Sequence, residues 1–211
     1  MDKFQNRYRI ATARAQWWNY GWNGAYFITI CTKNREHFFG EIRNGKMHLS
    51  DIGKIAQIQW IKTFEMRPDM KLWMGEYVIM PNHFHAIIGI GENEYNSPSE
   101  TQRAADRAAD DGAGGTDAMH CVSTTPPDTN IKSNWISPKN KFGPQSKNLA
   151  SIIRGFKTGV TTHARKFRPD FAWQSRFHDH IIRNNAEYQR ISDYIRNNPA
   201  KWQNDKMNSD K

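Results

Sequence analysis

Two histidines, His83 and His85, stand two positions apart in the segment PNHFH. The second of them opens the run HAIIGI, whose apolar, β-branched character is typical of a strand. Because side chains at i and i+2 of a strand point to the same face, both imidazoles can bind one cation, while Phe84 turns to the other face. An HxH pair also occurs among ordinary surface or core histidines, so its partners decide the interpretation.

A tyrosine and an asparagine near the end of the chain can complete such a site. Tyr194 and Asn198 are four positions apart in a predicted helix, so they share one of its faces. Tyr188 is the alternative, but its i+4 neighbour is Ser192, a poorer metal ligand than an amide oxygen. Two neutral imidazoles and one amide carbonyl suit Mg²⁺ or Mn²⁺ that also takes phosphate oxygens. The competing interpretation is an amphipathic-helix aromatic and a helix-terminal asparagine before Pro199.

These residues need a scaffold, and the hydrophobic pattern predicts one. Strands are predicted over 26–32, 72–80, 85–90 and 171–182, and helices over 51–67, 149–160 and 186–198. Their order gives the ferredoxin-like β-α-β-β-α-β plan. We therefore predict an α+β fold, a four-stranded antiparallel sheet with helices on one face, plus a C-terminal helix that carries Tyr194.

Length and composition predict one folded body with an unfolded piece. The chain has 211 residues, 37% of them hydrophobic, and a net charge of +9. Residues 92–130 have few large apolar side chains and carry eight acidic residues against two arginines, a composition that cannot bury enough surface to fold. The expected organisation is a basic, aromatic segment over 1–25, one domain formed by 26–91 and 140–202, a mobile acidic insertion over 92–139, and a disordered tail over 203–211.

Hydrophobicity, cysteine content and charge limit the classes of partner that the chain can bind. No window approaches about 18 consecutive apolar residues and the N-terminus has no apolar signal region, so we expect a soluble, cytoplasmic protein without a membrane partner. Two cysteines without CxxC spacing exclude a disulfide scaffold and structural zinc. A basic chain with many aromatic rings is suited to phosphates and unpaired bases. The expected DNA contacts are Arg7, Arg9, Arg14, Trp17, Trp18, Arg154 and Lys157. Alternatively, the tryptophans pack under the sheet and the cations form a solvated face.

Several motifs, met in order along most of the chain, resemble those of the REP-associated tyrosine transposases, prokaryotic members of the HUH superfamily of single-strand nucleases. The matching segments are YVIMPNHFHAIIGI, LASIIRGFK, WQSRFHDHIIRN and YIRNNP, whereas the acidic insertion departs from the family pattern. The resemblance implies that His83 and His85 bind metal, that Tyr194 is the nucleophile, and that Asn198 supplies the third ligand.

The segment FHDHIIR holds two further histidines. His178 or His180 can be interpreted as the third metal ligand instead, but their strand position favours a DNA contact or a structural role, and Asp179 between them should face away.

The resemblance also implies an activity. Tyr194 would cleave and rejoin hairpin-forming repetitive extragenic palindrome DNA through a 5′-phosphotyrosine, assisted by Mg²⁺ or Mn²⁺, in a nucleoid-associated monomer or homodimer. Both imidazoles must be neutral to bind metal, so activity is expected to fall below about pH 6. Two other functions fit the same residues, a non-catalytic nucleic-acid-binding module on this sheet and a zinc hydrolase in which a metal-bound water attacks.

Overall fold

A four-stranded antiparallel sheet forms the centre of the molecule, with its strands in the order β6-β7-β3-β8. The computed structural model describes residues 3–4, 7–8, 18–96 and 146–208. The strands are β3 (Gly24–Cys31), β6 (Leu72–Met80), β7 (His83–Ile90) and β8 (His178–Ile182). With α1 (Asp51–Glu65) between β3 and β6, and α3 (Leu149–Ala164) between β7 and β8, the chain follows the predicted β-α-β-β-α-β order.

The last strand is shorter than predicted. Of the expected 171–182, only His178–Ile182 pairs along β3, and Trp173 makes a single bridge to Thr32. Phe171 and Trp173 instead turn inward, where their rings lie 5.3 Å apart and contact Phe39. The apolar side chains of this segment therefore serve an aromatic cluster beside the sheet rather than a longer strand.

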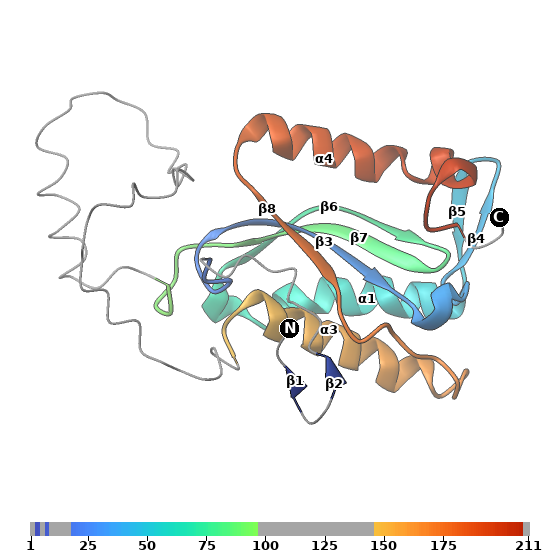
Figure 1. The fold of residues 1–211 in the computed structure, drawn as a ribbon, viewed down its shortest axis with the longest axis horizontal. Coiled ribbons are helices and arrows are strands. Elements are labelled where there is room, and N and C mark those ends of the chain that lie inside the picture. The colour runs from blue at the N-terminus through green and yellow to red at the C-terminus, as the bar shows by residue number, and fades with distance from the viewer. Residues whose placement is uncertain (1–2, 5–6, 9–17, 97–145, 209–211) are drawn as a thin grey trace, which may run out of the picture.

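Helices α1 and α3 both cover one face of the sheet (Figure 1). Ser50 caps α1 by accepting from Gly53 N, and the helix ends before Pro68, as the residue-before-proline rule predicts. Asn148 and Ser151 form a capping box at the start of α3.

The core lies between these two helices and the sheet. Trp60 of α1 packs its ring 5.0 Å from Phe84 of β7 and 5.3 Å from Phe156 of α3. All three side chains are buried, so this side of the sheet holds an aromatic core.

Of the described helices, α4 (Asn185–Asn197) lies on the opposite face of the sheet (Figure 1). Asn184 caps it by accepting from Glu187 N, and its apolar stripe buries Ile191 and Ile195 against Ile87 of β7. The predicted C-terminal helix with Tyr194 is present, and it covers the face that the crossover helices leave open.

Several short elements were not predicted. Strands β4 (Gly40–Arg43) and β5 (Lys46–Leu49) form a hairpin whose turn, Asn44-Gly45, has both φ angles positive (52° and 70°). Asparagine and glycine are the residues that tolerate such a turn. The remaining elements are β1 (Lys3–Phe4), β2 (Arg7–Tyr8), and the 3₁₀ turns η1 (Lys33–Arg35), η2 (Pro68–Met70) and η3 (Pro199–Asn204).

Two of the predicted boundaries move. Residues 203–208, expected to be a disordered tail, are held by side chains from the domain: Asn82 Nδ2 donates to Met207 O and Arg35 Nη1 donates to Lys206 O, both at 2.8 Å. At the start of the insertion, Asn93 is buried and donates to Met70 O and Gly91 O, so 92–96 belong to the folded domain. The rest of the insertion, 97–139, lies outside the described residues. Within the ranges that the structure does describe, no helix combines the length and apolarity needed to cross a membrane.

Candidate active site

Strand register places both predicted metal-binding histidines on the sheet face that α4 covers. His85 lies opposite Thr29, and His83 lies opposite Cys31. Phe84, between them, points to the other face and is fully buried in the core. The alternation expected from the HxH pattern is therefore confirmed.

Both histidines are buried and each is held through its Nδ1 atom. His83 Nδ1 lies 2.8 Å from Asn82 Oδ1, and because Asn82 Nδ2 donates to Met207 O, that oxygen is the acceptor for a proton on His83 Nδ1. His85 Nδ1 lies 2.8 Å from Thr29 Oγ1. The proton on His83 Nδ1 leaves His83 Nε2 with a free electron pair that can bind a metal. The contact with Thr29 fixes the orientation of the His85 ring.

Burial keeps these imidazoles neutral. It lowers the pKa of His83 to about 3, with the positive charge of Arg35 as the next cause. It lowers the pKa of His85 to about 3 as well, and the nearby His83 adds to that effect. Neutral imidazole is the ligand form, so both side chains are ready to bind a cation at any ordinary pH.

Helix α4 and the residue that follows it bring Tyr194 and Asn198 to the histidines. Tyr194 Oη lies 3.2 Å from His85 Nε2, although the two residues are far apart in the sequence. Tyr194 is 47% exposed, whereas His85 is 1% exposed, so the tyrosine is accessible to solvent while the histidine that it contacts is buried. Burial and then the charge of Asp205 raise the pKa of Tyr194, and a hydrogen bond with Asn198 opposes them.

Two buried atoms at this place lack partners. Among the buried side-chain polar atoms of the described residues, four have no hydrogen-bond partner, and His83 Nε2 and Asn198 Oδ1 are two of them. Buried polar groups are normally satisfied, so such a pair requires an explanation. The His83 ring lies 4.5 Å from that of His85, and the Asn198 side chain is hydrogen-bonded to Tyr194, whose Oη contacts His85. An imidazole nitrogen and an amide oxygen fit the ligand set for a divalent cation.

The other histidines do not join this set. No group of three or more His, Cys, Asp and Glu side chains that could hold a metal exists within the described ranges, so His178 and His180 do not complete a cluster with His83 and His85. His180 Nε2 is instead bound to Glu187 Oε1 at 2.8 Å. The Asn198 amide as third ligand therefore stays a prediction, and no His, Cys, Asp or Glu side chain of the described residues competes with it in such a group.

The rival tyrosine packs elsewhere. Tyr188 is partly buried with Ile87 and Ile191, and its ring lies 6.2 Å from that of Trp73 on β6. Its hydroxyl lies close to Gly75. Geometry thus separates the two tyrosines, and Tyr194 is the one whose hydroxyl contacts a site histidine.

His178 and His180 lie beside Tyr194 on the same sheet face. Register pairs His178 with Thr29 and His180 with Phe27, while Asp179 pairs with Ile28 on the core face, as expected. A hollow of about 470 Å³ opens there. It is lined by Phe27, His178, His180, Arg190, Ile191 and Tyr194.

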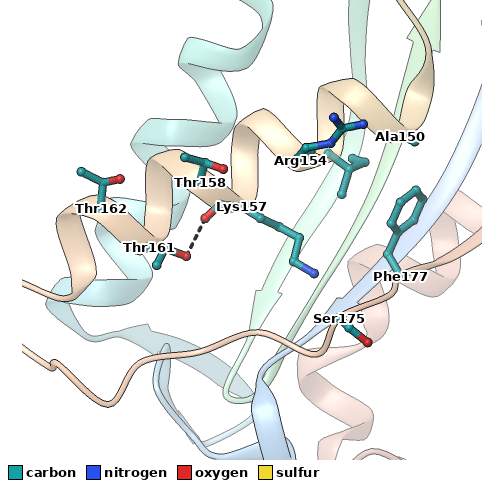
Figure 2. A pocket seen from close by; sticks show the side chains of 9 residues that line it. Ala150, Arg154, Lys157, Thr158, Thr161, Thr162, Ser175 and Phe177 are labelled. Atoms are coloured by element: carbon teal, nitrogen blue, oxygen red, sulfur yellow. Dashed lines mark hydrogen bonds between the residues drawn. The ribbon is translucent and has the colours of Figure 1, made fainter. Parts of the chain in front are cut away.

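A second hollow holds two of the predicted DNA-contacting cations. Arg154 and Lys157 of α3 line a space of about 490 Å³, together with Ser175 and Phe177 of the segment that leads into β8 (Figure 2). Figure 2 shows the Lys157 side chain extending from the helix towards that segment, where its ammonium donates to Gln174 O. Thr158, Thr161 and Thr162 also line the space, and the Thr161 hydroxyl donates to Lys157 O.

The aromatic N-terminal run is only partly described. Trp18 is 8% exposed and its Nε1 donates to Tyr26 Oη at 3.1 Å, so the packing alternative applies to this tryptophan. Arg9, Arg14 and Trp17 lie outside the described residues, and so does the side chain of Arg7. Their predicted contacts with DNA stay predictions.

Sequence reasoning missed the residues that support the site. Asn82 and Thr29 orient the histidines, and Phe27 stacks on His85 with 5.3 Å between ring centroids. Asp205 acts on Tyr194 from a segment that was expected to be disordered. Only Asn82, directly before the HxH pair, carried a signal, as a polar residue in the turn between two apolar strands.

Comparison with known proteins places this chain beside one curated relative. No family model matches the sequence. An uncharacterized protein of Haemophilus influenzae strain KW20 Rd is 35% identical over 198 residues, which cover 92% of this chain and 90% of that protein. The chain belongs to that protein's family.

Among solved structures, a REP-associated tyrosine transposase bound to a REP hairpin matches with a TM-score of 0.50 and 19% identity, over 91% of this chain and 74% of that one. A crystal structure of a putative transposase from Deinococcus radiodurans matches with a TM-score of 0.36 and 10% identity, over 88% and 97% of the two chains. The chain has the fold of a REP-associated tyrosine transposase. The fold that the sequence motifs implied is thus confirmed.

Proposed function

We propose that this protein is a single-strand DNA transposase that cleaves and rejoins hairpin-forming repetitive palindrome DNA through a tyrosine. One observation carries the proposal: the hydroxyl of the half-exposed Tyr194 lies 3.2 Å from His85 Nε2, in a site that also contains the unpartnered His83 Nε2 and Asn198 Oδ1. A nucleophile open to solvent beside neutral metal-ligand atoms is what covalent phosphoryl transfer requires. The fold shared with a REP-associated tyrosine transposase supports this choice.

His83, His85 and Asn198 would hold Mg²⁺ or Mn²⁺ through two imidazole nitrogens and one amide oxygen. Such a cation would supply Lewis-acid polarisation of the scissile phosphate. Thr29 and Asn82 keep the two imidazoles in the ligand orientation.

Tyr194 performs the covalent step. Its phenolic oxygen forms a bond to phosphorus while the bond to the 3′ oxygen breaks, giving a 5′-phosphotyrosine and a 3′-hydroxyl. The phenol loses one proton and the departing oxygen gains one, so the step is balanced. Attack by a 3′-hydroxyl on the phosphotyrosine reverses the reaction and restores both the phosphodiester and Tyr194, without a nucleoside triphosphate.

The proton of Tyr194 is held until attack. Burial and Asp205 raise the pKa of the phenol, so it is protonated at neutral pH. His85 Nε2 lies 3.2 Å from the phenol oxygen, but as a metal ligand it would have no electron pair left with which to accept the proton. The proton must therefore leave as the oxygen–phosphorus bond forms.

The DNA partner would contact two surfaces. Arg154 and Lys157, among the threonines of the α3 hollow, suit phosphates, and His178 and His180 lie beside the nucleophile. Because His83, His85, Tyr194 and Asn198 all come from one chain, a monomer would contain a complete site. Such an enzyme would act on the chromosome in a prokaryotic cytoplasm.

Covalent trapping tests the proposal. The protein is incubated with a REP-like hairpin oligonucleotide that has a single-stranded flank, with Mg²⁺ or Mn²⁺, and separated on a denaturing gel. We expect a shifted protein–DNA band for the wild type and for the matched control Tyr188→Phe, and none for Tyr194→Phe. Binding without any adduct would favour a non-catalytic module. DNA cleavage that forms no adduct and that persists in Tyr194→Phe would favour a zinc hydrolase. Either result overturns the proposal.

A further inference from the structure

The hollow beside Tyr194 is walled mostly by rings. Phe27 is one of them, with its ring centroid 6.1 Å from that of Tyr194 in an edge-to-face arrangement. His178 and His180 of β8 form another wall, and α4 contributes Arg190 and Ile191. Bases stack on phenyl and imidazole rings and on guanidinium planes, and this stacking tolerates any base. The lining is therefore suited to a flat, heteroaromatic group.

A carboxylate beside the hollow argues against a phosphate as its occupant. Glu187 accepts from Arg183 N at 2.9 Å, and its Oε1 lies 2.8 Å from His180 Nε2 and 3.4 Å from Arg190 Nη2. The cation that lines the hollow is thus already paired with an anion, and a phosphate would meet that anion as well. A neutral base meets no such repulsion. By contrast, the α3 hollow combines Arg154 and Lys157 with threonines, residue types whose side chains bind phosphates.

The same ion pair sets what His180 can recognise. An imidazole nitrogen that faces a carboxylate must carry its proton, so His180 Nε2 is the donor to Glu187. In the neutral ring the remaining nitrogen, Nδ1, is then an acceptor. An acceptor nitrogen on a ring that lines the hollow suits the N–H or amino group on the edge of an unpaired base.

We propose that this hollow binds one unpaired nucleobase of the DNA strand, next to the phosphate that Tyr194 attacks. Tyr194 itself lines the hollow. That the bound base lies next to the scissile phosphate rests on the proposed function, in which Tyr194 attacks that phosphate. Seating one base there fixes the adjoining phosphate relative to the Tyr194 oxygen. The hollow would thereby select single-stranded over paired DNA, since a paired base cannot enter it.

An abasic scan tests the proposal. Each unpaired nucleotide in the flank of a hairpin oligonucleotide is replaced in turn by an abasic site, and the dissociation constant is measured with Tyr194→Phe, which binds but cannot react. Loss of one stacked base is expected to weaken binding by about 5- to 150-fold at one position of the flank. In His178→Ala and His180→Ala, both built on the Tyr194→Phe background, that penalty should shrink at least threefold.

A matched control lies on the same helix. Arg196 pairs with Asp193 and Glu76 and does not line the hollow, so Arg196→Ala should leave the abasic penalty unchanged. Arg154→Gln should weaken the intact and abasic oligonucleotides equally. A penalty that stays the same in both histidine variants, or that appears at no position, overturns the proposal.

The outcome is separable from the fate of the proposed chemistry. A position-specific penalty that depends on His178 and His180, found in a protein that forms no adduct, would keep the base-binding hollow and reject the transposase reaction. An adduct on Tyr194 with a penalty insensitive to both histidines would keep the reaction and reject the hollow.

Discussion

The two faces of the central sheet are built from the same strands but bury different side chains. One face carries a large apolar core, and the other carries a polar site beside the smaller apolar cluster of Ile87, Ile191 and Ile195. On the α1 and α3 side, Ile28 and Phe84 are fully buried among apolar and aromatic neighbours. One residue along each strand, on the α4 side, Thr29 and His85 are buried as a hydrogen-bonded polar pair. Strand alternation thus separates an apolar core from a polar site by a single layer of backbone.

The difference shows how the fold supports reactive groups. The core face supplies stability, so the α4 face can leave His83 Nε2 and Asn198 Oδ1 unsatisfied and can expose Tyr194. Unsatisfied buried atoms cost free energy, and the packing of the opposite face offsets that cost. Truncation of a core-face ring should therefore change stability, and removal of the hydroxyl of the exposed Tyr194 should change chemistry with little effect on stability.

The largest effect is expected from Phe84→Ala. This ring is fully buried between Trp60 and Phe156, so its truncation should lower the free energy of unfolding by about 3–5 kcal/mol. Tyr194→Phe, which removes only the hydroxyl of a half-exposed side chain, should change it by less than about 0.5 kcal/mol. Urea denaturation followed by tryptophan fluorescence measures both. Equal losses would contradict the division between a stabilising face and a working face.

Acid should act through the polar face. In the folded chain His83 and His85 take up protons only near pH 3, whereas in the unfolded chain they do so near 6.5. The unfolded state therefore binds more protons between these values, and stability should fall as pH drops from about 6.5, by at most about 1.4 kcal/mol per pH unit for each imidazole. Urea titrations at pH 7, 6 and 5 measure this slope.

The same burial changes one sequence-based expectation. Proton competition at imidazoles with a pKa of about 3 should leave Mn²⁺ binding intact at pH 5, instead of abolishing it below about pH 6.

Two variants control the dependence of stability on pH. The slope of the free energy of unfolding against pH should be smaller in His83→Gln and unchanged in His48→Gln, which lies on β5 outside the site. An unchanged slope in His83→Gln would show that this buried imidazole is not responsible.

A smaller effect is expected from Asn82→Ala. This change removes the acceptor that orients His83 and should weaken Mn²⁺ binding by about 10- to 100-fold, measured by calorimetry. The matched control is Asn93→Ala, since Asn93 is also a buried amide but bonds to Met70 O and Gly91 O at the other end of β7. Equal affinities in the two variants would show that Asn82 serves stability alone.

The smallest effect concerns the α3 hollow, on the side of the sheet away from Tyr194. Arg154→Gln should lower the slope of log affinity for single-stranded DNA against log salt by about 0.7, the contribution of one phosphate contact. Lys62→Gln makes the same charge change on α1 and should leave the slope unaltered. If both variants lower it equally, the effect is one of net charge and the hollow has no special role.

The pairs of site residues could be predicted from the sequence because each pair depends on local periodicity. The period of two places His83 and His85 together, and the period of 3.6 places Tyr194 one turn before Asn198. Strand order followed from the sequence of elements. The supporting residues could not be predicted, because they depend on contacts across the fold: Thr29 and His85 are 56 positions apart, and Asn82 and Met207 are 125 apart.

The 203–208 segment shows the same limit. Its polar composition predicts a tail, yet its backbone carbonyls accept hydrogen bonds from Arg35 and Asn82, which composition does not reveal. The β4–β5 hairpin contained an Asn-Gly turn signal that its short, polar strands obscured.

Peptide mapping of the DNA adduct tests the central claim most directly. After trapping with a hairpin oligonucleotide and nuclease digestion, trypsin releases residues 191–196 (ISDYIR), in which Tyr194 is the tyrosine, separately from 184–190, which contain Tyr188. We expect the residual nucleotide mass on the 191–196 peptide, with fragment ions that place it on Tyr194. Nucleotide mass on the 184–190 peptide, or cleaved DNA with no modified peptide, would contradict the account.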